Sequence, residues 1–412
     1  MRDKELYKQI LGIESPWEVT EVELCVEANE VKVYVEHTAD QQTICPHCGT
    51  NCPGYDKRPR SWRHLDTCQF KTLLVADVPR VNCPAHGVVT VKVPWAEPGS
   101  NFTALYEALV IDWLKEASIQ AVSRRLSLSW NAIDGIMQRA VKRGLARRKN
   151  QVPKHIGVDE TAFCKGHDYV TVVTEQGDTS RVLHVAEERK TSSLESYYNT
   201  LTDEDKVGIE SIAMDMWPAY IKATLDNIPS AREKIAFDKF HVAKYLGDAV
   251  DKVRKQEHKT LMRDGYEDLK GTKYDWLTCL RNLNRKRQCE FKVLRESTLK
   301  TARAWAIKDL AMKLWCYVSR TWAEKGWVQW YAWAIRSRLE PIKKVAKMIK
   351  AHLWGILNAI ILNVTNGTSE SINSRIKMIK IRSRGFRNKA RFINAIYFHL
   401  GGLELYSECV TR

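Results

Sequence analysis

Two short pairs of cysteine and histidine residues limit what the N-terminal part of this chain can fold into. Two residues separate Cys45 from Cys48, two separate Cys83 from His86, and 34 lie between the pairs. Each pair can supply two ligands from one tight turn, and structural zinc takes four such ligands at the corners of a tetrahedron. The spacing therefore predicts a zinc ribbon in which these four side chains bind one structural Zn²⁺ ion.

Two alternatives to this ligand set are open. The second pair ends in histidine, and other potential ligands lie nearby in the sequence: His47, Cys52, His64 and Cys68. A ribbon that has lost its metal is the other alternative. The remaining cysteines are isolated, so we interpret them as small core residues: Cys25, Cys164, Cys279, Cys289, Cys316 and Cys409.

The sequence around the pairs has the alternation typical of β-strands. Residues 16–37 alternate apolar and polar side chains and turn at Ala28 and Asn29, which predicts two strands. Residues 70–78 predict another strand. We therefore expect a β-rich zinc-ribbon domain over residues 1–98.

The chain is strongly basic, which favours a polyanionic partner. Its 412 residues contain 65 Lys plus Arg against 49 Asp plus Glu, a formal net charge of +16. Such charge can also serve solubility alone, so its placement along the chain has to decide between a binding surface and mere solubility. The first residues are charged where a signal peptide would be apolar, which argues against secretion. The most apolar window, 352–364, is interrupted by two asparagines, which argues against a membrane span. We expect a cytoplasmic protein without membrane contact.

Residues 99–150 change to helical periodicity and predict a helix-turn-helix domain. Three helices are expected, near residues 105–114, 118–126 and 130–141. Residues 127–129 form the turn between the last two, and Ser129 is a suitable N-cap. A helical hairpin that does not bind DNA has the same pattern, so the surroundings matter.

Polar and basic residues on the last of these helices suit a DNA surface. Asn131, Asp134, Gln138 and Arg139 are expected to face outward, as on a recognition helix in the major groove. Residues 139–154 contain seven basic residues and no acidic one. The candidate phosphate contacts in this stretch are Arg139, Lys142, Arg143, Arg147 and Arg148.

Residues 151–241 alternate strand and helix in the order of a ribonuclease H-like sheet. Strands are expected at 156–160, 169–174, 181–185, 209–214 and 234–237, with helices at 192–201 and after Pro218. Asp159 lies near the end of the first strand, and the fourth strand leads into Asp215. Because these strands are neighbours in such a sheet, the two carboxylates are expected side by side, as hard oxygen ligands for divalent metal. A turn or cap role is the alternative for either residue.

The rest of the chain is mainly helical. Residues 242–360 hold eight of the 14 tryptophans, which we interpret mostly as the core of a helical domain, although one or two could stack on an unpaired base. In residues 361–412, Glu370 opens a helix and is a candidate third metal ligand. Eight basic residues without an acidic one follow between positions 375 and 391. The candidate DNA contacts there are Lys377, Lys380, Arg382, Arg384 and Arg387.

Six motifs in this order carry a resemblance to a known family. They are CPHC (45–48), VPWAEPGS (93–100), GVDE (157–160), MDMWPAY (214–220), FDKFHV (237–242) and TNGTSE (365–370). Together they cover nearly the whole chain, which closely resembles bacterial insertion-sequence transposases of the ISL-three type. Two positions depart from the family: His86, where Cys is more common, and Thr368-Ser369, where Pro and a hydrophobic residue are common.

The resemblance implies a multidomain α+β DDE transposase. A zinc ribbon and a helix-turn-helix precede a ribonuclease H-like α/β catalytic domain, which an all-helical insertion at 242–360 interrupts. The implied catalytic triad is Asp159, Asp215 and Glu370, and His241 matches an element thought to contact the reacting DNA.

The implied chemistry is phosphoryl transfer by two Mg²⁺ (or Mn²⁺) ions about 3.5 to 4 Å apart. Water cuts the strand at the element's end, and the freed 3′-OH then attacks target DNA. The expected partners are double-stranded DNA, as terminal inverted repeats and target, and further copies of the chain in a homodimer or higher oligomer, with nucleoid association when bound. A DNA-binding regulator without catalysis and a nuclease that cuts without joining are the alternatives.

Overall fold

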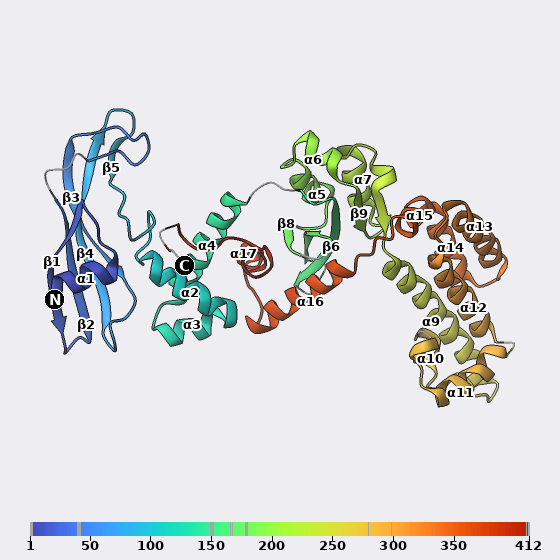
Figure 1. Cartoon of the computed structure of the whole chain (residues 1–412). Helices are drawn as coiled ribbons and strands as arrows, with labels where there is room; N and C mark the ends of the chain where they lie inside the picture. Colours follow the sequence, from blue (N-terminus) through green and yellow to red (C-terminus); the bar gives the residue numbers. More distant parts are fainter. Residues whose placement is uncertain are drawn as a thin grey trace. The chain divides into compact units, whose positions relative to one another are not determined.

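The computed structural model describes residues 3–38, 43–148, 152–164, 166, 168–177, 180–278, 280–297, 299–408 and 410. Cys279 and Cys409 lie outside these residues. The chain forms two compact units, each described by itself below (Figure 1). Unit 1 comprises residues 1–149, 382–385 and 402–412, and unit 2 comprises residues 150–381 and 386–401.

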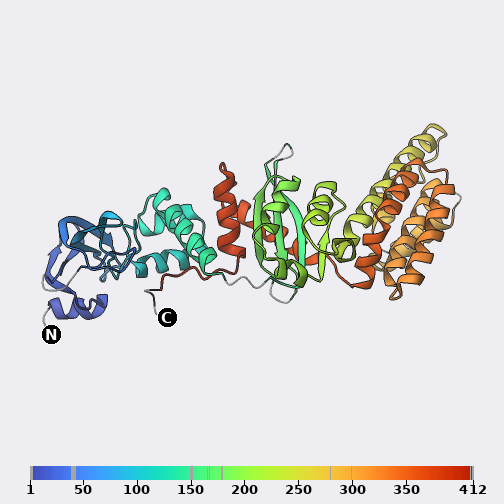
Figure 2. The ribbon, with the colours of Figure 1, turned by 90° about the horizontal axis from the view of Figure 1, so that it is seen from above.

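A five-stranded mixed sheet begins unit 1. The elements are α1 (Asp3–Leu11), β1 (Trp17–Cys25), β2 (Glu30–His37), β3 (Gly54–Arg63), β4 (Lys71–Cys83) and β5 (Gly87–Thr90). The strand order is β1-β2-β4-β3, with β5 paired to β4 and α1 packed against β1 (Figures 1 and 2). The predicted strands at 16–37 and 70–78 are confirmed. The alternation does not reveal β3, because this edge strand is exposed over most of its length and its sequence is polar.

Trp95, which follows the last strand, packs against two tryptophans of this sheet. Trp95 makes edge-to-face contacts with Trp17 and Trp62, at ring-centroid distances of 4.9 and 5.5 Å. All three rings are buried in the same core as the inward-facing residues of β2. Such aromatic contacts add to the stabilisation that comes from burial. They fix the segment that leads from the sheet to the next helix.

Three capped helices complete this part of unit 1. They are α2 (Ala104–Glu116), α3 (Ile119–Leu126) and α4 (Trp130–Arg147). Thr103, Ser118 and Ser129 each accept a backbone N–H at the start of a helix. Ser127 adopts a left-handed conformation (φ 51°) at the turn between α3 and α4. The predicted helix, turn and helix are confirmed, and α4 continues beyond residue 141.

The C-terminal residues pack onto α4 within unit 1. The Leu405 carbonyl accepts hydrogen bonds from Arg143 Nε (3.0 Å) and Nη2 (2.6 Å). The Tyr406 carbonyl accepts one from Arg147 Nη1 (2.6 Å). This contact joins segments 259 residues apart, and no local sequence pattern announces it.

A second mixed sheet forms the centre of unit 2. Its strands are β6 (His155–Cys164), β7 (Asp168–Glu175), β8 (Val182–Glu187), β9 (Ser211–Met214) and β10 (Ile235–Phe237), in the order β10-β9-β6-β7-β8. The helices between them are α5 (Thr191–Tyr198), α6 (Asp203–Gly208), α7 (Pro218–Asn227) and α8 (Ala231–Lys234). The predicted adjacency of the first and fourth strands is confirmed, since β6 pairs with β9 in parallel.

One strand boundary was predicted wrongly. β6 does not end at residue 160 but continues to Cys164, because its antiparallel pairing with β7 runs on to Asp168. Only the parallel pairing with β9 stops before Asp159. The carboxylate therefore projects from the middle of a strand.

Among the described residues from 239 to 361, the regular elements are all helices. They are α9 (Lys239–Arg263), α10 (Lys273–Leu277), α11 (Arg285–Glu296), α12 (Lys300–Lys313), α13 (Arg320–Arg336), α14 (Glu340–Ala351) and α15 (Leu353–Ile361), with short 3-10 turns at Leu280–Asn282 and Leu314–Cys316. Four tryptophans are buried here, at 276, 305, 327 and 330, whereas Trp322 and Trp333 are exposed. The interpretation as core residues is thus confirmed for these four buried tryptophans. No described helix combines the length and apolarity needed to cross a membrane.

Two helices follow: α16 (Gly367–Arg382) and α17 (Lys389–Leu400). The chain is thus a mixed α+β protein with a β-rich N-terminal region, a run of helices and two mixed sheets.

Candidate active site and cysteine cluster

Asp159 and Asp215 occupy equivalent positions on neighbouring strands. The last parallel pair between β6 and β9 joins Val158 to Met214, and each aspartate is the next residue. Asp159 is buried at 9% exposure, and its Oδ1 accepts the Glu160 N–H at 2.8 Å. Asp215 Oδ1 accepts the N–H of the following residue at 2.6 Å. The register brings the two carboxylates to the same sheet edge, as the sequence predicts.

The start of α9 adds Asp238 and His241 to this edge. Asp238 follows β10, caps α9 by accepting the Phe240 N–H (3.3 Å), and donates its own N–H to the Met214 carbonyl (3.2 Å). His241 Nδ1 lies 3.6 Å from Asp215 Oδ2. Asp238 Oδ2 is buried and has no hydrogen-bond partner among the described residues. The predicted His241 therefore lies beside one member of the predicted triad.

Hydrogen bonds among Thr174, Gln176 and Ser369, here called the latch, fix the beginning of α16, which carries Glu370. Ser369 Oγ lies 2.9 Å from Thr174 Oγ1 and accepts a hydrogen bond from Gln176 Nε2, also at 2.9 Å. Both partners belong to β7 or the residue after it, next to β6. Glu370 follows Ser369, is half-buried, and its Oε1 has no partner in the described part of the chain.

Burial and like charges disfavour ionisation of these carboxylates. Burial raises the pKa of Asp159 to about 7, and the charges of Glu160 and Asp215 act in the same direction. Burial also raises the pKa of Glu370 and of Asp238, and Asp238 adds to the shift of Glu370. The mutual influence shows that the carboxylates share one electrostatic environment. A cation at this edge would offset both effects.

The donor set fits divalent metal. Carboxylate oxygens are the ligands that Mg²⁺ and Mn²⁺ prefer, and two of these buried oxygens lack a partner among the described residues. The oxygens of Asp159, Asp215 and Glu370 do not all lie within 4.8 Å of one another.

Sequence reasoning missed Asn373. Its Nδ2 donates to Asp159 Oδ2 at 2.8 Å and to the Glu160 carbonyl at 3.4 Å. Glu370 and Asn373 are three residues apart and so share one face of α16. That spacing is the only local signal that could have indicated the residue.

The structure brings the predicted zinc ligands together. The ligand atoms of Cys45, Cys48, Cys83 and His86 all lie within 4.8 Å of one another. Cys48 Sγ is 3.6 Å from Cys83 Sγ, and His86 Nδ1 is 3.5 Å from Cys83 Sγ and 3.8 Å from Cys45 Sγ. Tetrahedral zinc with bonds of about 2.3 Å needs edges of about 3.8 Å, so the cluster fits the ion. Hydrogen bonds from Thr50 lower the pKa of Cys48 to about 6, toward the thiolate form that zinc binds.

The alternative ligands lie outside this cluster. Cys68 is exposed with a left-handed backbone (φ 54°), and Cys52 Sγ donates to the Thr50 carbonyl at 3.3 Å. The His47 ring contacts that of His86 without joining the ligand set.

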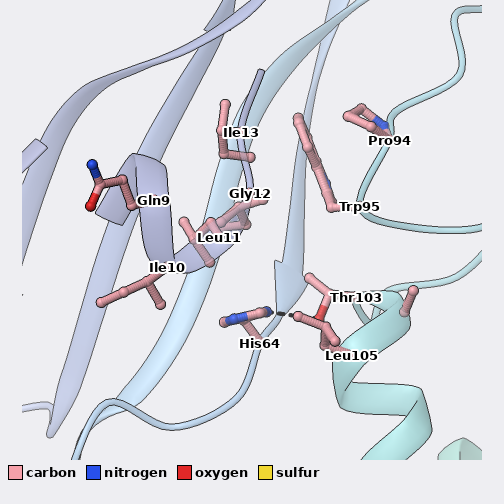
Figure 3. A pocket seen from close by; sticks show the side chains of 12 residues that line it. Gln9, Ile10, Leu11, Gly12, Ile13, His64, Pro94, Trp95, Thr103 and Leu105 are labelled. Atoms are coloured by element: carbon pink, nitrogen blue, oxygen red, sulfur yellow. Dashed lines mark hydrogen bonds between the residues drawn. The ribbon is translucent and has the colours of Figure 1, made fainter. Parts of the chain in front are cut away.

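His64 lines a cavity of about 320 Å³ in unit 1 (Figure 3). The figure shows the imidazole directed at Thr103, whose Oγ1 is 2.9 Å from Nδ1. Burial lowers the pKa of His64 to about 4, so the ring is neutral at physiological pH. The other lining residues, among them Leu11, Ile13 and Trp95, belong to neither predicted site.

On α4, the exposed residues include Asn131, Gln138 and Lys142. The prediction that Asp134 faces outward is wrong. Its side chain is buried at 3% exposure and accepts a hydrogen bond from Gln138 Nε2 at 2.8 Å. Burial on the inner side of α4 turns this carboxylate toward the helix packing rather than toward solvent.

The arginines of α4 are largely engaged within the protein. Arg143 has only 7% side-chain exposure and pairs with Glu97 and Glu107. In this arrangement its guanidinium is engaged within the protein rather than exposed for a phosphate contact. Arg139 bonds to Glu107 through Nε (2.9 Å) and Nη2 (2.5 Å), and Arg147 bonds to the C-terminal residues. Arg148 is half-buried.

In the second basic stretch most of the predicted DNA contacts are exposed: Lys377, Arg382, Arg384 and Arg387. Arg382 also donates to the Lys115 carbonyl at 3.1 Å. Lys380 is different, because its Nζ donates to the carbonyls of Ala162 and Phe163 at 2.9 Å each. Its charge therefore serves to dock α16 on β6.

Comparisons with known proteins show to which family the chain is similar. Three family models match in succession: the zinc finger of transposases IS204/IS1001/IS1096/IS1165 at residues 41–86, the helix-turn-helix domain of transposase family ISL3 at 91–141, and the ISL3 DDE transposase at 156–396. The chain is 25% identical over 367 residues to the transposase for insertion sequence element IS1001 of Bordetella parapertussis, covering 88% of this chain and 89% of that protein. It is 24% identical over 435 aligned positions to the transposase for IS1557 of Mycobacterium tuberculosis, covering 98% and 96%. The chain therefore belongs to the ISL3 family of DDE transposases, the enzymes of insertion sequences.

Proposed function

We propose that the edge formed by Asp159, Asp215 and Glu370 is the catalytic site of a ribonuclease H-like domain, interrupted by a helical insertion between the second and third carboxylates. The observation that carries this proposal is the register of β6 and β9, which sets the two aspartates side by side. The strand order β10-β9-β6-β7-β8 and the docking of α16 beside β6 support it.

In this proposal Asp159, Asp215 and Glu370 would together hold two divalent ions. When bound, the ions activate the attacking oxygen and stabilise the leaving 3′ oxygen. Water first breaks a phosphodiester bond at the element's end and leaves a 3′-OH. That hydroxyl then forms the new bond to a target phosphorus, whose own 3′ oxygen leaves. His241, beside Asp215, is positioned to donate a hydrogen bond to the scissile phosphate.

Unit 1 supplies DNA recognition in this proposal. The exposed face of α4 around Asn131 reads the terminal inverted repeats, and exposed basic residues such as Lys142 and Arg384 bind phosphates. The Cys45, Cys48, Cys83 and His86 cluster binds one structural zinc ion. Two or more copies act together on the element ends and the target.

The decisive experiment incubates the purified protein with Mg²⁺ and a labelled duplex that carries the terminal repeat. We expect 3′-OH ends and products joined to target DNA. Asp159→Asn, Asp215→Asn and Glu370→Gln should each abolish cleavage and leave terminal-repeat binding nearly intact, because each removes one metal ligand but not the reading domain. Normal cleavage by any of the three variants refutes that residue's role. Cleavage without joining identifies a nuclease, and binding without cleavage identifies a regulator.

A further inference from the structure

Asn373 forms a hydrogen bond between α16, which carries Glu370, and β6, which carries Asp159. It lies one turn beyond Glu370 on α16, and its Nδ2 reaches Asp159 Oδ2 on β6, 214 residues away in the sequence, at 2.8 Å. The same Nδ2 lies 3.4 Å from the Glu160 carbonyl oxygen. Both partners are acceptors, so the amide must present its nitrogen to them.

We propose that Asn373 is a positioning residue that holds the Asp159 carboxylate in the orientation needed to bind divalent metal. This inference rests on the proposed function of the site. Groups that hydrogen-bond to a metal-ligating side chain fix its orientation, and their loss typically weakens metal binding by about tenfold to a hundredfold. Asn373 holds one oxygen of Asp159, while the Glu160 N–H holds the other.

An amide suits this position on electrostatic grounds. A lysine would place a positive charge where the metal must bind, and an aspartate would add repulsion to a group of neighbouring carboxylates. A neutral donor orients Asp159 without either cost. Asn373 Oδ1 is buried and has no partner among the described residues, so the amide keeps one acceptor available to a donor entering the site.

The docking of α16 does not depend on this bond. Ser369 is held by Thr174 and Gln176 at the start of the helix, and Lys380 binds two carbonyls of β6 further along. Removing the Asn373 amide should therefore leave the helix in place. Its loss can be separated from a loss of structure.

The test measures Mn²⁺ binding to the full-length protein without DNA, by electron paramagnetic resonance, together with the Mg²⁺ dependence of cleavage. Asn373→Ala, and Asn373→Leu as a variant of similar volume, should each weaken Mn²⁺ binding about tenfold to a hundredfold. A correspondingly higher Mg²⁺ concentration should restore cleavage, which a merely structural defect would not allow. Met378→Ala, at an exposed position further along the same helix, should bind Mn²⁺ as the unaltered protein does.

Asp159→Asn in the same titration separates two kinds of failure. If it abolishes Mn²⁺ binding while both Asn373 variants bind normally, the positioning role is refuted and the proposed catalytic site stands. If Asp159→Asn binds Mn²⁺ normally, the proposed site is refuted together with this inference.

Discussion

Gly157 and Gln176 approach each other so closely that a Cβ on Gly157 would lie 1.9 Å from Gln176 Nε2. The same Cβ would lie 2.4 Å from Ser369 Oγ and 2.8 Å from Asn366 Oδ1. The absence of a side chain at position 157 thus provides the space for the latch that holds the start of α16. A glycine two residues before Asp159 thereby controls where Glu370 sits.

We expect Gly157→Ala to displace this latch. The extra methyl group should lower the free energy of unfolding by about 1–3 kcal/mol, the usual cost of overpacking. A shift of α16 by about 1 Å should reduce cleavage about a hundredfold. Urea unfolding and the cleavage assay measure the two effects.

The matched control is Gly208→Ala, at the end of α6. A Cβ there meets nothing within 4 Å, so stability and cleavage should be nearly unchanged. Unaltered cleavage by Gly157→Ala would show that the latch does not position Glu370.

The relation of Asp159 to Asp215 could be predicted because parallel strands bring equivalent positions to one edge of a sheet. The contacts of Asn373 and Gln176 could not, since they join β6 or β7 to a helix about two hundred residues later, beyond any local periodicity. Arg143 shows the same limit. Its sequence neighbourhood is basic, but Glu97 and Glu107 neutralise it from other elements.

Removing the metal should unfold the Cys/His end of the first sheet. Cys83→Ser should bring the zinc content from one ion per chain to nearly none, because three ligands hold zinc poorly. A chelator should lower the melting temperature of the unaltered protein for the same reason. Elemental analysis and thermal unfolding measure these changes.

Cys68→Ser is the control, since this exposed cysteine lies outside the cluster, and it should retain one zinc ion. The absence of zinc from protein purified without chelator would remove the assignment. Full zinc content in His86→Ala would instead point to Cys52, the buried cysteine packed beside Cys45 and Cys83.

His64 should make the stability of the protein depend on pH. Its pKa is about 4 in the folded protein against an ordinary value of 6.5, so the unfolded chain binds a proton that the folded protein excludes. The stabilisation is complete above the unfolded pKa and is lost as the pH falls toward the folded pKa, by up to about 3 kcal/mol. His64→Asn can keep a hydrogen bond to Thr103 and should be less sensitive to acid.

Denaturant unfolding from about pH 7 to about pH 5 compares the two proteins. Both keep the same Cys/His cluster, so the effect of acid on that cluster cancels in the difference. Equal loss of stability in both proteins would mean that His64 is not the titrating group.

Reading and holding DNA should depend on different residues. Asn131 is exposed on α4 and can contact base edges, so Asn131→Ala should cost about 1–3 kcal/mol of discrimination between the terminal repeat and a scrambled duplex. Gln138→Ala tests the same face, although its amide also bonds to Asp134.

Arg384→Ala removes only an exposed positive charge. It should weaken binding to both duplexes alike, and the slope of the logarithm of the binding constant against the logarithm of the salt concentration should fall by about one. Binding isotherms over a salt series on both duplexes measure these effects. If Asn131→Ala weakens both duplexes equally, α4 is not the reader, and the zinc ribbon becomes the better candidate.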